Sequence, residues 1–362
     1  MNGHQHKAEQ VISKQENKPT SEFRIFIRKF ALRLFVFGIL LLLVFALRLP
    51  KAYYYDLPKK TIHSKLSWIK EKLDATQTLD NTVVFVGSSV CFFGINDSLL
   101  NARDTTGTQY LNLGVVHHNN DIADVILRDI LISRKLKPAK VLLCVKSDAL
   151  ARDVHHMYPL VAGRDEILSG ISAGNTQLIP TILKRVSWNT HYFTGHVKFD
   201  EGEDSLIFNS SYGYKAQDII DSLVVESSYR AQKAGMESVF SFIEQSTAGG
   251  NKGIKQQLLG IKRNYIDNEK FQLEEFRRSA SLLEAHGIDY DIIIYPNLVA
   301  SRAGKEGVMA AYMQKLIPEI DYTQHRILIP TGDIFKDARS YVDMNHLSPM
   351  GADGFSEWVV GQ

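Results

Sequence analysis

The pattern of apolar and polar positions divides the chain into a polar start, one long apolar segment and an alternating remainder. Residues 1–22 are polar and show no periodicity, which predicts a disordered tail. The apolar segment covers residues 30–49 and reads FALRLFVFGILLLLVFALRL. As a helix it would span roughly 30 Å, which is the thickness of the hydrocarbon core of a bilayer. The pattern therefore predicts one transmembrane helix, within an anchor over residues 23–50.

Two other kinds of segment, a buried core helix and a cleaved signal peptide, can have the same length and apolar character. A buried core helix is disfavoured because Arg33 and Arg48 lie near the ends of the segment, where their stems reach the membrane interface. A cleaved signal peptide is disfavoured because the following RLPKAYYYD offers no cleavage site of the small-x-small type. Basic residues are slightly more frequent before the segment than after it. We therefore expect the tail in the cytoplasm and residues 51–362 outside the cell membrane, in the periplasm or the extracellular space.

Beyond the anchor, short strand-like apolar runs alternate with longer stretches of helical periodicity. This order is typical of a parallel sheet with helices on both faces, so we expect a three-layer α/β/α domain over residues 51–362. The expected strands are residues 83–86, 110–113, 141–145, 288–295 and 326–329. The expected helices are residues 63–73, 121–134, 217–244, 255–286 and 307–317. Residues around 152–214 fit neither period, which predicts an insertion or lid over the edge of the sheet.

Composition and charge narrow the class of protein. The chain is 44% hydrophobic and 23% charged, which is the balance of a folded protein with a core. Its formal net charge is +2 and it has no long basic block, so we expect no nucleic-acid partner. Cys91 and Cys144 are flanked by apolar residues, which favours two buried thiols and leaves a disulfide bridge as an alternative. No metal-ligand spacing or phosphate-binding loop occurs, so we expect neither a metal nor a cofactor.

The first expected strand runs into the sequence VVFVGSSVCFFGIND. Gly87, Ser88 and Ser89 then lie where a buried strand turns into a helix. This turn places a serine at the carboxyl edge of the sheet, which is the usual position of sites in open α/β folds. The N–H groups of a helix N-terminus would also stabilise an oxyanion there. By itself, a serine at this position is more often only a helix N-cap.

A second polar group lies near the C-terminus, in YVDMNHLSPMGADGFSEWV. Asp343 and His346 are three residues apart and precede an expected helix, with Ser348 as its N-cap and Pro349 at its first position. One ring nitrogen of His346 is then free to reach a serine while Asp343 fixes the other. The two polar groups together predict a triad of Ser89, His346 and Asp343. Alone, the Asp-x-x-His pair also fits a bond that only stabilises the loop.

These stretches resemble the SGNH hydrolase superfamily, and most closely its membrane-anchored DltD-like and alginate-acetylation-type members, which act in envelope polymer acylation. VFVGSSV is similar to the first family block, YLNLGVVHHNN to the second and DMNHLSPMGADGFSEWV to the last. The resemblance implies an SGNH domain of the flavodoxin-like type. It also implies Ser89 as nucleophile, Asp343 and His346 as its partners, and the backbone at Ser89 and Gly114 as donors to the oxyanion.

The chain departs from the family pattern in two places. Ser88 stands where the first block has an Asp, which is not a member of the triad. The third block should supply an Asn that donates to the oxyanion, yet the middle strand continues as VLLCVKSDAL. Lys146, Ser147 or Asp148 occupies that place, and loss of one such donor costs roughly 2.7–4 kcal/mol of barrier lowering. Asn112, Asn119 and Asn120 are the candidates to replace it.

The second block also supplies candidates for contact with a substrate. They follow the second expected strand toward the same edge of the sheet, and they are Asn112, His117, His118 and Asn119. For the two histidines, an exposed loop without a function is an equally simple interpretation. Tyr53, Tyr54 and Tyr55 suit an aromatic belt at the outer membrane interface or, equally, a loop packed on the domain.

Three functions are compatible with these residues. The resemblance favours a membrane-anchored O-acyltransferase that moves an acyl group, in the first place acetyl, onto a cell-envelope polysaccharide or related polymer through a serine acyl-enzyme. It also implies a multi-spanning membrane O-acyltransferase of the MBOAT type as partner. The first alternative is a surface-anchored carbohydrate esterase or deacetylase, in which water is the acceptor. The second is a non-catalytic scaffold subunit of an acylation complex, which the missing third-block Asn favours.

Overall fold

The computed structural model divides into two compact units, Met1–Leu47 and Arg48–Gln362. The residues that it describes are 21–46, 55, 64–115, 120–145, 158–194, 264–343 and 345–362, with single positions between 225 and 244. In the described part of the first unit lies the helix α1 (Ser21–Ala46). Its 26 residues would span about 39 Å, and it is long and apolar enough to cross a membrane. Residues 1–20 of the expected tail and residues 47–50 of the expected anchor lie outside the described residues, whereas Ser21 and Glu22, which were expected in the tail, belong to α1.

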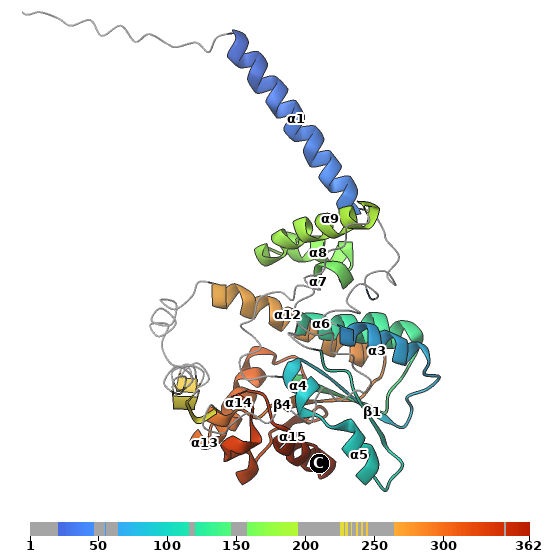
Figure 1. Ribbon diagram of the computed structural model, residues 1–362, viewed down its shortest axis with the longest axis vertical. Coiled ribbons are helices and arrows are strands. Elements are labelled where there is room, and N and C mark those ends of the chain that lie inside the picture. The colour runs from blue at the N-terminus through green and yellow to red at the C-terminus, as the bar shows by residue number, and fades with distance from the viewer. Residues whose placement is uncertain are drawn as a thin grey trace, which may run out of the picture. The chain divides into compact units, whose positions relative to one another are not determined.

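A sheet of five parallel strands forms the centre of the second unit (Figure 1). Its strands are β1 (Thr82–Gly87), β2 (Gln109–Asn112), β3 (Lys140–Val145), β4 (Tyr290–Ile294) and β5 (Ile327–Leu328). Their order across the sheet is β2-β1-β3-β4-β5, and every pair is parallel. The expected α/β class and parallel sheet are confirmed, and each strand lies within two residues of its expected bounds.

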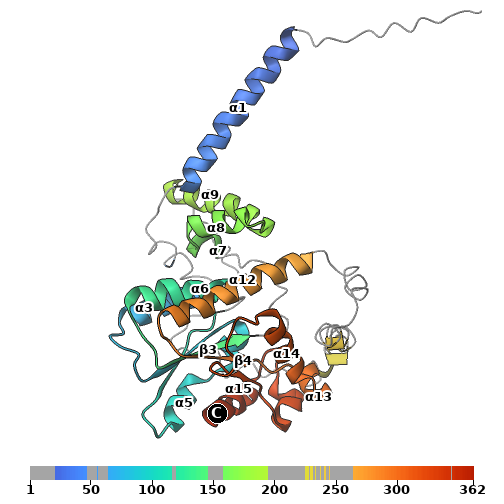
Figure 2. The same cartoon turned by 180° about the vertical axis from the view of Figure 1, so that it is seen from behind.

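Helices cover both faces of this sheet (Figures 1 and 2). One face carries α3 (Ser64–Asp74), α6 (Asn120–Val125) and α12 (Asn264–Ala285). The other carries α4 (Ser89–Gly94), α5 (Asp97–Arg103) and α15 (Pro349–Val360). Near β4 and β5 lie α13 (Leu298–Ala303), α14 (Glu306–Leu316) and the 3-10 turns η6 (Asp333–Lys336) and η7 (Ala338–Ser340).

The strands form because their side chains are buried on both faces, which gives continuous apolar runs rather than alternation. On the α15 side, Phe85, Leu142 and Ile293 belong to one buried cluster with Phe355. On the opposite side, Val86 and Leu143 lie beside α6 and α12, where they line a small cavity with Phe276. The core therefore consists of two apolar layers, one on each face of the sheet.

Two helical regions differ from the sequence expectations. The helix expected over residues 121–134 is α6 followed by a π-helical turn, η2 (Ile126–Leu131), and a 3-10 turn, η3 (Ile132–Arg134). The segment around 152–214 contains α7 (Tyr158–Val161), α8 (Arg164–Ser172), η5 (Thr176–Leu178) and α9 (Ile179–Thr194). We call residues 158–194 the helical insertion. Residues 255–263, where the fourth expected helix begins, lie outside the described residues, and the described positions between 225 and 244 are helical.

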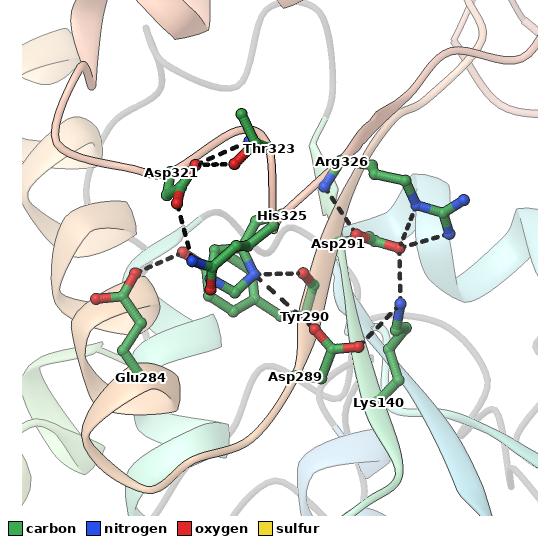
Figure 3. Close-up of polar contacts among 10 residues, drawn as sticks. Lys140, Glu284, Asp289, Tyr290, Asp291, Asp321, Thr323, His325 and Arg326 are labelled. Carbon is green, nitrogen blue, oxygen red and sulfur yellow. Dashed lines mark hydrogen bonds and ion pairs between the residues drawn. The ribbon is translucent and has the colours of Figure 1, made fainter.

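A polar cluster holds the amino ends of β3, β4 and β5 together (Figure 3). Lys140 Nζ lies 3.0 Å from Asp291 Oδ2, and Arg326 Nη2 lies 2.9 Å from the same oxygen. Burial raises the pKa of the Asp291 carboxyl, but the bonds from Arg326 and Lys140 outweigh it and hold that pKa below its ordinary value. Because its carboxylate is bonded on both oxygens, this cluster is part of the scaffold, at the edge of the sheet opposite to Ser89.

Candidate active site

Ser89 owes its position to a close approach between β1 and β3. β1 ends at Gly87, Ser88 is the N-cap residue, and α4 begins at Ser89. A Cβ on Gly87 would lie 2.7 Å from Cys144 Cβ and 2.8 Å from Cys91 Cβ, so only glycine fits at this turn. The strand order reverses direction between β1 and β3, and sites in such sheets lie beyond the carboxyl ends of the strands at this switch point.

Asp343 and His346 lie in a tight loop just before α15. The loop is closed by an antiparallel bridge between Tyr341 and Leu347 and by a bond from the Val342 N–H to the His346 carbonyl, 2.9 Å. α15 begins at Pro349 with Ser348 as its N-cap, as the sequence predicts. The loop is therefore fixed at both ends by backbone bonds and a helix cap.

The structure brings the three predicted side chains together. Ser89 Oγ lies 2.8 Å from His346 Nε2, and His346 Nδ1 lies 2.7 Å from Asp343 Oδ2. The other carboxylate oxygen of Asp343 accepts the N–H groups of Asn345 and His346, at 2.7 and 2.8 Å. The imidazole is thus held at both nitrogens, one facing the serine and one facing a carboxylate that the loop backbone orients.

The electrostatics of Asp343 suit this arrangement. Burial raises the pKa of its carboxyl, but the bond from the His346 ring and the two backbone N–H bonds outweigh burial and hold that pKa below its ordinary value. The group is therefore ionised at neutral pH. An ionised carboxylate at Nδ1 selects the ring tautomer with its proton on Nδ1, which leaves Nε2 free to accept a proton from Ser89.

Two asparagines that the sequence did not single out hold the loop against the sheet. Asn297 caps α13 by accepting the N–H groups of Val299 and Ala300, and its Nδ2 donates to Asn345 Oδ1 at 2.7 Å. Asn297 is buried at the carboxyl end of β4, so this bond ties the triad loop to a strand end. A search for polar residues within three positions after a buried strand, which finds Ser89, would also have found Asn297.

Asn112 and Gly114, which the sequence predicts to assist the triad, use their polar groups in bonds within the protein. Asn112 is fully buried, and its amide donates to the carbonyls of Cys91 and Ile95 at 3.0 and 2.9 Å. This amide joins β2 to α4 in the structure, and a substrate contact by Asn112 stays a prediction. The Gly114 N–H donates to Asn112 Oδ1 at 2.8 Å, so an oxyanion role for Gly114 would require that bond to break.

The other candidates give no alternative donor within the described residues. Asn120 is buried, and its amide donates to the Gln272 carbonyl at 3.0 Å. The remaining candidates, on which the substrate-contact and third-block predictions rest, lie outside the described residues and are His117, His118, Asn119, Lys146, Ser147 and Asp148.

The two cysteines both lie against Gly87 and carry free thiols. The disulfide alternative is therefore wrong, and the interpretation as two buried thiols holds. Burial raises the pKa of the Cys91 thiol, and contact with Cys144 raises it further, which makes this thiol a packing group rather than a nucleophile.

Within the described residues, no group of three or more His, Cys, Asp or Glu side chains is arranged to hold a metal ion. In comparisons with family models, curated proteins and solved structures, nothing matches this chain. The fold and the site together define an α/β protein with a Ser-His-Asp constellation at the switch point of a parallel sheet.

Proposed function

We propose that this protein is a membrane-anchored SGNH-type O-acyltransferase. In this proposal it moves an acyl group, in the first place acetyl, onto a cell-envelope polysaccharide or related polymer through an acyl-enzyme on Ser89. The observation that supports it most is the pair of bonds that joins Ser89 Oγ to His346 Nε2 at 2.8 Å and His346 Nδ1 to Asp343 Oδ2 at 2.7 Å. This geometry is what a serine needs for activation as a nucleophile.

The first half of the reaction acylates the serine. His346 Nε2 takes the proton of Ser89 as Oγ bonds to the carbonyl carbon of an acyl donor, and negative charge collects on the carbonyl oxygen. The backbone N–H of Ser89 belongs to the first turn of α4 and so has no acceptor within its helix, which makes it a candidate donor for that oxygen. Collapse of this tetrahedral intermediate breaks the bond to the leaving group, which receives the proton from His346.

The second half transfers the acyl group. A sugar hydroxyl gives its proton to His346 Nε2 and attacks the acyl carbon, and collapse releases Ser89 Oγ, which takes the proton back. Asp343 stabilises the imidazolium in both halves. Water in place of the sugar makes the same chemistry an esterase or deacetylase reaction, and the outcome depends on how well the acceptor excludes water.

The apolar helix α1 supports transfer over hydrolysis. We propose that it anchors the chain by a single pass, with the N-terminus in the cytoplasm and the second unit outside. A tether beside a membrane raises the effective concentration of the domain near a membrane-embedded source of acyl groups. The partner in this proposal is a multi-spanning O-acyltransferase of the MBOAT type, which would deliver the acyl group.

Labelling with a fluorophosphonate, followed by mass mapping, tests the nucleophile. The wild-type chain should carry one adduct, on Ser89, while Ser89→Ala and His346→Ala should carry none and unfold at the same denaturant concentration as wild type. Ser88→Ala is the matched control, because the Ser88 hydroxyl is buried and makes no side-chain cap bond, and it should label as wild type. An adduct at another serine would contradict the assignment, and a fully unreactive wild-type chain would favour the scaffold function.

A second assay separates transfer from hydrolysis. The full chain is incubated with an activated acetyl ester, with and without an oligosaccharide acceptor, and acetate and acetylated sugar are both measured. Transfer predicts that the acceptor speeds ester consumption and collects most of the acetyl groups. Release of acetate at the same rate in both samples would identify an esterase.

A further inference from the structure

The helical insertion exposes large apolar side chains to solvent. Leu168 on α8 and Ile179 and Leu183 on α9 are 41%, 51% and 61% exposed. Among the described residues of the second unit, the other large apolar side chains this exposed are Met350 and Val360, on α15. Ile179 and Leu183 are one helical turn apart and therefore share a face of α9. We call Leu168, Ile179 and Leu183 the α8–α9 apolar surface.

The two helices that carry this surface are packed together as one body. A Cβ placed on Gly170 of α8 would lie 2.4 Å from Cδ1 of Leu178, the residue directly before α9. Arg185, which is buried on α9, donates to the carbonyl of Ala162 at 2.8 Å. The apolar side chains are therefore presented on a fixed support.

Buried ionic contacts join the helical insertion to the helices on the sheet. Arg128, in the turn after α6, forms ion pairs with Asp124 of α6, at 3.0 Å, and with Glu166 of α8. Tyr158 of α7 donates to Glu275 of α12 at 3.4 Å. These groups are buried or half-buried, so the insertion keeps its orientation on the second unit.

Tyr55, which follows the end of α1 by nine positions in the sequence, belongs to the second unit. α1 ends at Ala46, and nine residues later Tyr55 is buried in the second unit. Burial raises the pKa of the Tyr55 hydroxyl, and the carboxylates of Asp129 and Glu166 raise it further, which places Tyr55 within electrostatic reach of α8. Nine extended residues span at most roughly 30 Å. The segment between Ala46 and Tyr55 is therefore a short tether.

We propose that the α8–α9 apolar surface docks on the lipid surface of the membrane in which α1 is anchored. This inference rests on the proposed anchor. Leu168, Ile179 and Leu183 would enter the boundary between headgroups and acyl chains, and the exposed Lys184 would place its ammonium among the headgroups. Docking would give the domain one orientation on its tether.

The size of the surface favours lipid over a protein partner. A stable protein interface buries on the order of 1,000 Å² or more, which three partly exposed side chains do not provide. A bilayer is present wherever α1 is inserted, and the short tether keeps it at high effective concentration, so a weak contact is enough for docking. A binding partner such as the proposed multi-spanning acyltransferase would need additional surface.

Depth-dependent quenching in vesicles tests this inference. The full chain is reconstituted into vesicles of phosphatidylcholine and phosphatidylglycerol, and Leu183→Cys is labelled with an environment-sensitive dye. Met350→Cys is the matched control, because Met350 is 44% exposed on α15, and the native thiols Cys91 and Cys144 are buried. Docking predicts at least about threefold more quenching by spin-labelled lipid at position 183 than at position 350. Adding Ile179→Asp should abolish the difference, since a carboxylate resists entry into lipid.

Three outcomes would overturn the inference, and they are distinguishable. Equal quenching at positions 183 and 350, in chains that stay in the vesicles after an alkaline wash, would reject docking while keeping the anchor. Release of the chain by that wash would reject the proposed anchor itself. Protection of the label from aqueous iodide in native membranes, but not in the vesicles, would show that a protein covers this surface.

Discussion

At the scale of single residues, the triad depends on how one loop uses both oxygens of Asp343. One oxygen bonds the His346 ring, and the other accepts the N–H groups of Asn345 and His346. The same carboxylate therefore shapes the loop and selects the tautomer of the ring. A loop-stabilising role and a catalytic role, which are alternatives for an Asp-x-x-His pair in a sequence, coincide here.

Asp343→Asn separates these two roles. An amide has one accepting oxygen, so if it keeps the two loop N–H bonds, its NH₂ faces Nδ1 and favours the wrong tautomer. We expect fluorophosphonate labelling of Ser89 to slow by about 10³- to 10⁴-fold at neutral pH, while the circular dichroism spectrum stays that of wild type. Unchanged labelling would mean that Asp343 only stabilises the loop.

The bond between Asn297 and Asn345 should position the triad without touching a substrate. Asn345→Ala removes the acceptor and leaves the α13 cap intact, so labelling should slow by about tenfold and the free energy of unfolding should fall by about 1 kcal/mol, the net contribution of one hydrogen bond. Asn297→Ala loses the cap as well, and should lower the free energy of unfolding by about another 1 kcal/mol. Rates of labelling and denaturant unfolding measure the two effects. If Asn345→Ala labels as fast as wild type, the bond has no positioning role.

At the scale of elements, the turn from β1 into α4 is the most constrained part of the site. Gly87→Ala would force a Cβ to within 3 Å of both cysteines, and such overpacking costs about 1–3 kcal/mol. Gly307→Ala, in α14, is the matched control, because nothing lies within 4 Å of its Cβ position, and it should be neutral or slightly stabilising. Denaturant unfolding of both variants checks this, and equal midpoints would show that the turn relaxes easily.

The elements that the sequence predicts well are those whose environment is uniform. Buried parallel strands need apolar side chains at every position, so β1 and β3 were predicted almost to the residue. The sequence does not predict the change of helix type between α6 and η3. A π-helical turn adds one residue to a turn and leaves the apolar pattern almost unchanged. The helical insertion buries apolar side chains such as Ile167, Leu178 and Val186, but turns divide it into short helices, so no single helical period runs through the segment.

The site also contains residues that the sequence predicts and residues that it does not. Ser89, His346 and Asp343 could be predicted because their residue types and their places at element ends carry the signal. The role of Asn112 could not, since an amide that bonds buried carbonyls and one that contacts a substrate look identical in a sequence. The bond between Asn297 and Asn345 depends on the distance between two segments that lie 48 positions apart, which no local pattern contains.

At the scale of the whole molecule, the helical insertion contacts the helices on the sheet through carboxyl groups. Burial destabilises the ionised form of these groups. Burial raises the pKa of the Asp124 carboxyl to about 6, although the charge of Arg128 opposes this and those of Glu166 and Asp129 add to it. Burial also raises the pKa of Glu275 well above its ordinary value, against the charge of Arg278. Stability should therefore depend on pH through this contact.

The sign of that dependence follows from proton uptake. The Asp124 carboxyl has a pKa of 3.8 when unfolded and about 6 when folded, so between these values the folded chain binds more protons. The free energy of unfolding then falls as pH rises from 4 to 6, by up to about 3 kcal/mol for two pKa units. This fall is smaller if water reaches the group.

Asp124→Asn should remove this fall. Denaturant unfolding of the full chain in detergent at pH 4, 5, 6 and 7 should give a flatter profile for the variant than for wild type. Asp333→Asn is the control, because the Asp333 side chain is 98% exposed, and its profile should run parallel to that of wild type. Asp124 also pairs with Arg128, and because the wild-type carboxyl is mostly protonated below about pH 6, the variant loses this ion pair only above that pH. Parallel profiles for Asp124→Asn and wild type would mean that the carboxylate stays ionised in the folded protein, and that the attachment of the insertion does not respond to pH through this group.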